Sequence, residues 1–463
     1  MRRIHTLFAV LMLGGCTAAP PADPGLAVAV PGSEIAAPRG DSPPVLRPQG
    51  PLTLADAIAM ALASNPDVAA ADWDHRATQA RHDFARGARL PRLSAVGSYV
   101  HHLDEQRLLP VRQPGDPAIL SRDIVSGDLV LTMPIFAGGR LVNQIEAAEL
   151  LQQAAGHRLA RSREELVFNV SSVFLSILAQ RQVIESLEFS GRALQQHLDR
   201  VDALIATQKA ARVDRLRTEV RLADVQQRLV RERNVMAIQH RALVSLLGSE
   251  GQSEALSIEG DLESKERVSV PQLETALEMA WSGRDDYLAA RSALEAQARN
   301  VEVARAGHSP TVFVQGSYGG RWAVGDTTGA GEELDDIGRI GLGAEIPLYE
   351  GGQVNAQVQE QRAHLAAARE RLRKLELQIR LDIETALLNV RSAQERIAAI
   401  QTSVAQAQES LRIEREKYDV GRGAIVDVLD AQSALLESQT NYYRALADYH
   451  VATAQMKLAM GEQ

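Results

Sequence analysis

The sequence of 463 residues contains a single cysteine, Cys16, and only 4% aromatic residues. One cysteine excludes both an intrachain disulfide framework and a zinc site built from several cysteines. The scarcity of large rings favours long helices packed side by side over a core built on aromatic side chains. The chain also lacks an excess of positive charge, and its formal net charge of −9 argues against a protein that binds nucleic acid.

Long apolar runs are scarce beyond the N-terminus. The best candidate, Leu166–Ala179, has only about 14 residues and contains Asn169 and three serines, which is too short and too polar for a membrane helix. If the chain crosses a membrane, we expect it to do so with strands.

The N-terminus has the features of a secretion signal, because Arg2 and Arg3 precede an apolar segment at 4–13. The run Leu13-Gly-Gly-Cys16 resembles the bacterial lipoprotein signal, in which the cysteine is acylated, for example with palmitate, and becomes the first mature residue. Residues 1–15 are thus predicted to be the signal peptide, and 16–51 to be the lipidated Cys16 with a tether rich in proline and glycine. Thr17 in place of aspartate usually means delivery to the outer membrane. The alternative is an ordinary signal peptide with a chance cysteine.

The remaining chain contains two internal repeats. Tyr99 and Tyr318 are 219 residues apart, whereas Pro134-Ile-Phe-Ala-Gly-Gly and Pro347-Leu-Tyr-Glu-Gly-Gly are 213 apart. The offset changes only between the prolines that bound each strand pair, so a single loop varies in length. We assign repeat 1 to 52–248 and repeat 2 to 271–461, joined by a linker at 249–270.

Each repeat predicts a helix, a strand pair, a long helix, a tip turn and a second helix. The strand pairs lie at 91–135 and 310–348, and the tip turns lie near 208 and 421. The long helices, about Arg140–Thr207 and Gln353–Val420, would each span about 100 Å, and apolar residues recur along them with heptad spacing from Leu166. The first helices, at about 53–87 and 271–306, together with the last ones match the long helices in length. We therefore expect one continuous helix packed against two half-length helices.

The strand pairs alternate apolar and polar residues, as transmembrane strands do. Val312, Val314 and Tyr318 lie on one face, and Gln315 and Ser317 lie on the other. By pattern alone, a sheet that caps the helices of a soluble protein is about equally well supported. The predicted junction between strands and helices comprises Pro91, Pro134, Gly138, Gly139, Pro310, Pro347, Gly351 and Gly352.

Four strands cannot close a barrel, and open edges in lipid would leave backbone groups unpaired. Two chains would give a barrel filled by side chains, whereas three would give twelve strands and can leave an aqueous lumen. The expected fold class is an α+β membrane protein: a trimeric 12-stranded transmembrane β-barrel, with four strands per chain, continued by a long α-helical barrel.

The segment Tyr418–Asp430, followed by Ala431-Gln432, resembles the tip turn of TolC-type outer-membrane efflux proteins. Leu54–Ile58, Asn65-Pro66, the Pro-x-x-x-Gly-Gly pair and Leu247-Gly248 are similar to the same family, so the resemblance covers roughly 52–461. It implies a lipid-anchored homotrimer in the outer membrane of a Gram-negative bacterium, with a helical barrel through the periplasm. Such a duct passively conducts small molecules or drugs from an inner-membrane pump, commonly proton-driven, and a periplasmic adaptor (membrane fusion) protein.

The resemblance also implies roles for single residues. Asp427 and Asp430 match acidic residues that ring the periplasmic constriction, where threefold symmetry would give two carboxylate rings that favour cations; a solvated helix face is the alternative. Tyr418 matches a tyrosine that ties the closed tip. Gly423 stands where the family has a gate-locking arginine, and Arg422 is one residue early. The implied tip-gate and adaptor contacts are Tyr418, Gly421, Arg422 and Gly423, with Gln208 and Lys209 in the first turn, which lacks the glycine.

The sequence contains no credible catalytic constellation, cofactor motif or metal-ligand cluster. Gly341-x-Gly343 lacks the third glycine of a nucleotide loop and opens no helix. We therefore predict an exit duct that is not an enzyme and needs no cofactor. The alternatives are the outer-membrane component of a type I protein secretion system and a non-channel periplasmic coiled-coil structural lipoprotein. A periplasmic adaptor is disfavoured, because it would have a single hairpin and a β-rich lipoyl-like domain.

Overall fold

The computed structural model describes residues 50–108, 120–208, 210–248, 257–263, 268–324 and 335–462. The predicted signal peptide, most of the tether with Cys16, and Lys209 lie outside these ranges. Residues Pro51–Gln463 group into one unit, and the fold given below is that of this unit.

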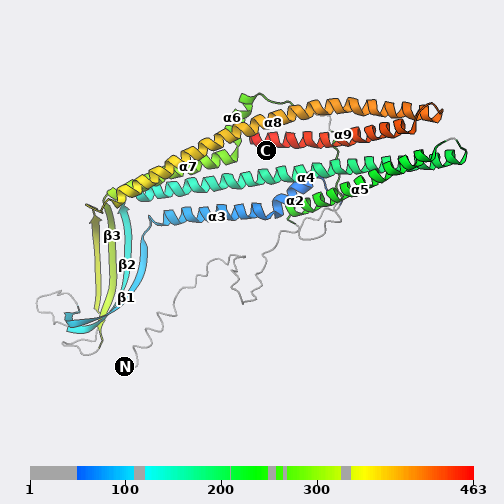
Figure 1. Cartoon of the computed structure of the whole chain (residues 1–463). Helices are drawn as coiled ribbons and strands as arrows, with labels where there is room; N and C mark the ends of the chain where they lie inside the picture. Colours follow the sequence, from blue (N-terminus) through cyan, green and yellow to red (C-terminus); the bar gives the residue numbers. More distant parts are fainter. Residues whose placement is uncertain are drawn as a thin grey trace. The chain divides into compact units, whose positions relative to one another are not determined.

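The two halves of the unit have the same order of elements (Figure 1). The first half contains α2 (Leu54–Ser64), α3 (Pro66–Gly87), β1 (Arg92–Arg107), β2 (Leu120–Phe136), α4 (Arg140–Ala206) and α5 (Arg212–Leu246). The second half contains α6 (Leu273–Gly283), α7 (Asp285–Arg305), the 3₁₀ turn η1 (Ala306–His308), β3 (Thr311–Ala323), β4 (Asp335–Glu345), α8 (Gln353–Asp419) and α9 (Ile425–Met460).

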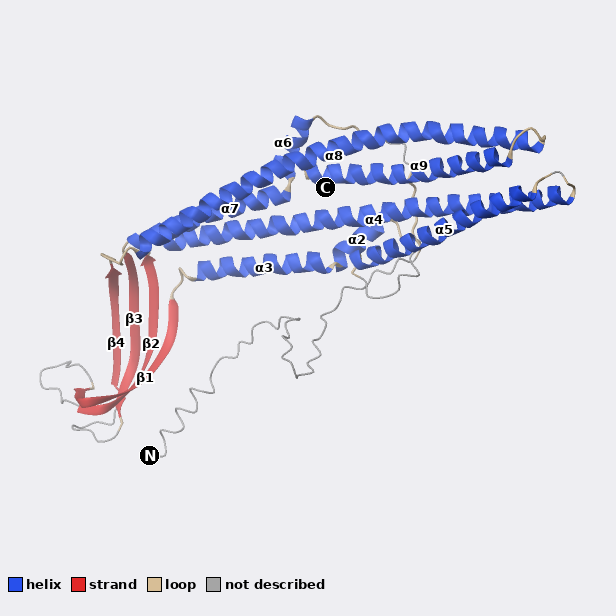
Figure 2. Ribbon diagram, in the orientation of Figure 1, coloured by secondary structure: helices blue, strands red, loops and turns tan. Residues whose placement is uncertain are grey.

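The long helices α4 and α8 have 67 residues each and organise the packing. Helix α4 contacts α3 toward the sheet and α5 toward the tip, and α8 contacts α7 and α9 in the same way (Figure 2). The predicted arrangement of one continuous helix against two shorter ones is therefore confirmed. Helix α4 also contacts α7 and α9, which joins the two repeats.

The prediction of an unbroken first helix in each repeat is wrong. In repeat 1 the helix stops at Ser64 and restarts at Pro66, because proline lacks the N–H that a continuous helix needs. Asn65 caps the new start, where its side chain accepts hydrogen bonds from the backbone N–H groups of Asp67 and Val68. In repeat 2 the break falls at Arg284, whose backbone is extended.

In each repeat, the C-terminal end of the last helix contacts the break in the first helix. Ser64 Oγ donates to the carbonyl of Leu247 at 2.7 Å, and Asn65 Nδ2 donates to that of Leu246 at 3.0 Å. In repeat 2 the buried Arg284 reaches the carbonyl of Ala459 at 3.5 Å and forms ion pairs with Asp286 and Asp382. These contacts fix the end-to-end stacking of α3 on α5 and of α7 on α9.

The heptad positions of the long helices form the core. In α4 the buried ones include Leu166, Val170, Ile177, Ile184, Leu187, Leu194, Leu198 and Val201. In α8 they include Ile379, Ile383, Ala386, Val390 and Leu411. Gln180 interrupts the apolar heptad pattern of α4 and is also buried. Its Nε2 donates to a carboxylate oxygen of the buried Glu232 at 2.8 Å.

Helix α4 contains the only stretch in the described residues that is long and apolar enough to cross a membrane by length and composition. The prediction that no helix qualifies was therefore too strict. Half of that 18-residue stretch is buried inside the chain, and the heptad contacts just described account for its apolar character.

The strands form one antiparallel sheet in the order β1-β2-β3-β4. β1 and β2 have 16 and 17 residues, and β3 and β4 have 13 and 11. Among the described residues β1 pairs only with β2, and β4 pairs only with β3. The sheet therefore has an open edge on each side.

Candidate functional sites: the sheet, its junction and the helical tips

One face of the sheet is apolar and uncovered. Leu93, Ile340 and Leu342 are 66%, 82% and 77% exposed, so the part of the chain that the structure describes leaves them largely uncovered. A sheet that caps the helices of a soluble protein would bury this face, because large exposed apolar patches mark interaction or membrane surfaces. The exposed apolar side chains on this face include Leu93, Tyr99, Leu129, Leu131, Tyr318, Ile340 and Leu342.

The opposite face carries polar side chains that bond to one another across strands. The hydroxyl groups of Ser98 and Ser126 lie 2.7 Å apart, and Arg339 Nε donates to Ser317 Oγ at 2.9 Å. An apolar face backed by a polar one is the pattern of a strand between lipid and water.

The apolar face ends in two matching tyrosine–aspartate pairs. Tyr99 donates to Asp123 at 2.6 Å, and its repeat partner Tyr318 donates to Asp336 at 2.9 Å. His101 also contacts Asp123, with Nδ1 at 2.7 Å. A tyrosine with its ring on apolar surface and its hydroxyl on a charged group suits a membrane interface.

The junction between strands and helices depends on its glycines. Gly138 and Gly139 have φ of +61° and +83°, and Gly351 and Gly352 have +62° and +82°. Residues with a side chain disfavour positive φ, so the Gly-Gly pair allows the chain to turn from a strand into the long helix. At Gly138 a Cβ would also overlap the Cβ of Ser309, whereas at Gly351 nothing lies within 4 Å.

The prolines of the junction lie at or near the ends of the strands. Pro91 and Pro310 come directly before β1 and β3, and Pro347 follows β4. Pro134 lies inside β2, next to an irregularity of the pairing with β3 that spans Pro134 to Phe136. These are the positions at which a sheet tolerates a residue without an N–H.

The tip turn of repeat 2 is a Schellman motif. The N–H of Gly421 donates to the carbonyl of Tyr418, and that of Arg422 donates to Lys417, both at 2.9 Å. Gly421 has φ of +71°, as this motif requires. In repeat 1, Gln208 occupies the corresponding position and is left-handed too, with φ of +57°. The first turn therefore keeps the left-handed conformation, although its residue there is glutamine and not glycine.

Gly423 has little room for a side chain. A Cβ there would lie 3.0 Å from the Cβ of Lys417 and 3.0 Å from the backbone nitrogen of Tyr418. An arginine at this position would require the turn to shift. The neighbouring Arg422 is exposed.

Three ion pairs connect the four helices next to the tips, and sequence reasoning missed all of them. Arg200 of α4 pairs with Asp419 of α8 at 3.0 Å, Arg215 of α5 pairs with Asp202 of α4 at 2.8 Å, and Arg221 of α5 pairs with Asp430 of α9 at 3.0 Å. Arg200–Asp419 and Arg221–Asp430 join residues more than 200 positions apart, for which the sequence gives no signal.

Tyr418 is half-buried and packs against His197 of α4, with ring centroids 5.5 Å apart. Burial raises the pKa of the Tyr418 hydroxyl. Burial lowers the pKa of His197, and the nearby Arg415 and Arg200 lower it further. The Nε2 of His197 is buried without a hydrogen-bond partner among the described residues, so this contact favours the neutral imidazole.

The two predicted constriction residues differ in their surroundings. Asp427 is exposed in the first turn of α9 and has no ion-pair partner within the described ranges. Asp430 is also exposed but is paired with Arg221. In the part of the chain that the structure describes, no group of three or more His, Cys, Asp or Glu side chains is placed to hold a metal ion.

The sheet with one lipid-compatible face, continued by paired helices of great length, defines a channel-forming outer-membrane protein. The chain matches the model of the "Outer membrane efflux protein" family at residues 57–249 and 276–462, one repeat in each match, and belongs to that family. It is therefore part of an outer-membrane exit channel of an efflux or secretion system, in a family of channel proteins rather than enzymes. Its place is the outer membrane of a Gram-negative bacterium, from which it extends into the periplasm.

Individual relatives are distant but cover most of the chain. "Outer membrane protein TolC" of Vibrio cholerae is 22% identical, covering 81% of this chain and 83% of the relative. The protein of the same name from Escherichia coli is 24% identical, covering 86% and 80%. The crystal structure of VceC, an outer membrane protein of Vibrio cholerae, superposes with a TM-score of 0.74 at 21% identity, covering 88% and 96%.

Proposed function

We propose that three copies of this chain form a closed 12-stranded barrel with a helical barrel below it, and that this duct passively passes small molecules or drugs to the exterior. The observation that carries the proposal is that, within the described ranges, the sheet and the helices are unpartnered on matching flanks. The contacts order the helices from α3 and α5, through α4, then α7 and α9, to α8. The sheet runs from β1 to β4 in the same sense.

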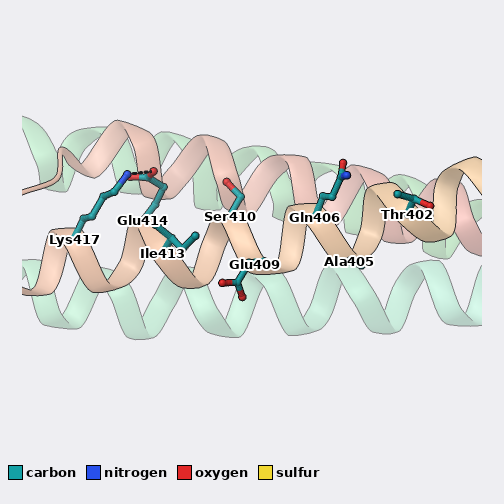
Figure 3. A pocket seen from close by; sticks show the side chains of 8 residues that line it. All are labelled: Thr402, Ala405, Gln406, Glu409, Ser410, Ile413, Glu414 and Lys417. Carbon is teal, nitrogen blue, oxygen red and sulfur yellow. Dashed lines mark hydrogen bonds and ion pairs between the residues drawn. The ribbon is translucent and has the colours of Figure 1, made fainter.

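Each helical flank has a surface that no described residue covers. A groove along α8 is lined by residues of that helix alone, with Lys417 and Glu414 paired at its tip end (Figure 3). Its lining residues recur every three or four positions, as in a helix-packing seam. On the other flank α5 exposes a row of apolar side chains: Val213, Leu216, Val220, Val230 and Ile238. We infer that α5 of one copy covers the α8 groove of the next.

Contacts between unlike flanks generate rings when the rotation closes. Joining β4 of one copy to β1 of the next satisfies both open edges in lipid. Three copies are the smallest number that leaves a water-filled lumen for cargo, since eight strands enclose only side chains.

Leu216→Glu tests this assembly, because it places a charge in the proposed contact between copies. The purified protein is expected to lose its chemically cross-linked trimer and its single-channel conductance in planar bilayers. Gln226→Glu, at an exposed polar position of the same helix, serves as the control and should retain both. A wild-type protein that is a non-conducting monomer or dimer would refute the proposal.

We further propose that Cys16 carries the lipid anchor. A single acyl chain binds membranes only marginally, so several chains together with the barrel would hold the protein in place. Labelling of growing cells with radioactive palmitate should mark the protein, and Cys16→Ala should abolish the label while Thr17→Ala retains it. A label that persists in the Cys16 variant would contradict this assignment.

We propose that the tips receive cargo from a periplasmic adaptor and an inner-membrane pump, driven by protons. Exposed residues at the second turn, including Val420 and Arg422, offer the contact. Cross-linking from the tip of the full-length protein in cells, followed by identification of the captured chains, tests the partner. A deletion strain should become susceptible to small toxic compounds. Loss of a secreted protein with unchanged susceptibility would point to secretion instead.

A further inference from the structure

Asp430, near the start of α9, forms an ion pair with Arg221 of α5. Its Oδ1 lies 3.0 Å from Arg221 Nη2, and the side chains of Asp430 and Arg221 are 64% and 36% exposed. Exposed pairs of this kind contribute little to stability. What the pair does change is the field around the tip, because opposite charges 3.0 Å apart act at longer range as a weak dipole.

The two repeats place different charges at corresponding positions. The residues 213 positions before Asp427 and Asp430 are Asp214 and Arg217. Asp214 accepts a hydrogen bond from the backbone N–H of Ala211 at 3.2 Å and so caps α5. Repeat 1 therefore contributes a basic residue where repeat 2 contributes Asp430. Arg217 precedes Arg221 by one helical turn and lies on the same face of α5.

We propose that Arg221 is a determinant of charge selectivity at the tip, because it offsets the charge of Asp430 and leaves Asp427 as the carboxylate that attracts cations. This inference rests on the proposed trimeric channel. Each subunit then contributes one uncompensated carboxylate to the constriction in place of two. The duct discriminates less by charge than two full aspartate rings would.

Removing Arg221 should restore the second ring. Three extra uncompensated carboxylates at a distance on the order of 10 Å, screened at 0.1 M salt, raise the local cation concentration about twofold. The same potential lowers the local anion concentration by the same factor, so Arg221→Gln should raise the cation-to-anion permeability ratio about fourfold, and by more at 0.01 M salt. Asp430→Asn leaves Arg221 unpaired and should shift the ratio in the opposite direction.

The experiment measures reversal potentials of the purified full-length channel in planar bilayers across a KCl gradient. Arg228→Gln is the matched control, because Arg228 lies on the same helix and also forms an exposed ion pair, with Asp224 at 3.1 Å. It should change the ratio much less than Arg221→Gln. Arg221→Lys keeps the charge and should behave as wild type, and Arg221→Gln with Asp430→Asn should return close to it.

Two results would overturn the inference. One is an unchanged ratio in Arg221→Gln, and the other is a change no larger than that of Arg228→Gln. A wild-type protein without any conductance would remove the proposed channel as well, whereas a conducting channel with either result would remove this inference alone.

Discussion

Replacing Gly138 with alanine, and Gly351 separately, tests how the chain turns from the sheet into the long helices. Both residues have nearly the same φ, +61° and +62°. An alanine in this region costs about 1–2 kcal/mol, which is the whole effect expected at Gly351, where the space is open. At Gly138 the new Cβ also overlaps Ser309, and relief of such an overlap costs about another 1–3 kcal/mol. Gly138→Ala should therefore destabilise the protein by about 2–5 kcal/mol.

The assay is urea unfolding of the detergent-solubilised protein, followed by far-UV circular dichroism, with the variants compared at equal protein and detergent concentrations. Ser309→Gly in the Gly138→Ala background removes the overlapping atom and should bring the loss down to that of Gly351→Ala. Equal losses in the two single variants, or no recovery in the double variant, would refute the reasoning from close approach.

Three further predictions concern the tips. Gln208→Gly should stabilise the protein by about 0.5–1 kcal/mol, because glycine adopts the positive φ of this position without strain, and a loss of stability would contradict this. Gly421→Ala should destabilise the protein by about 1 kcal/mol in the same urea assay. Because the pKa of His197 is lowered in the folded protein, the unfolded chain binds the proton first as pH falls, and stability should decrease below about pH 6.5. His197→Gln should flatten that part of the curve of urea midpoint against pH, and an equally steep curve would rule out this residue as the source. Asp427→Ala combined with Asp430→Ala should weaken the cation preference of the pore in bilayer recordings, and unchanged selectivity would reject both as constriction residues.

The long helices were predictable almost to the residue. Repeat 1 was expected to have a helix at Arg140–Thr207, and α4 spans Arg140–Ala206. The precision comes from comparing two copies, because Gly139 and Gly352 mark the starts and the conserved offset of 213 residues fixes the ends. The alternation of side chains likewise predicted the two faces of the sheet.

The breaks in the first helices were missed for two different reasons. Asn65-Pro66 carried a local signal, since proline interrupts helices, but the apolar pattern was followed through it. At Arg284 there is no such signal, and the break coincides with ion pairs to Asp286 and Asp382 and a contact to the end of α9. Contacts between distant segments decide such positions, as they do for Arg221 and Asp430 at the tips.

The interrupted helices have a mechanical consequence. Along each repeat α4 or α8 runs without a break among the described residues, while its shorter companions meet end to end at Asn65 or at Arg284. A helix packed against two shorter helices that meet end to end bends most easily where the shorter helices meet. Because the repeats place their joints at corresponding positions, flexing would concentrate in one belt part-way along the helices, and the tips could tilt while the strands stay fixed.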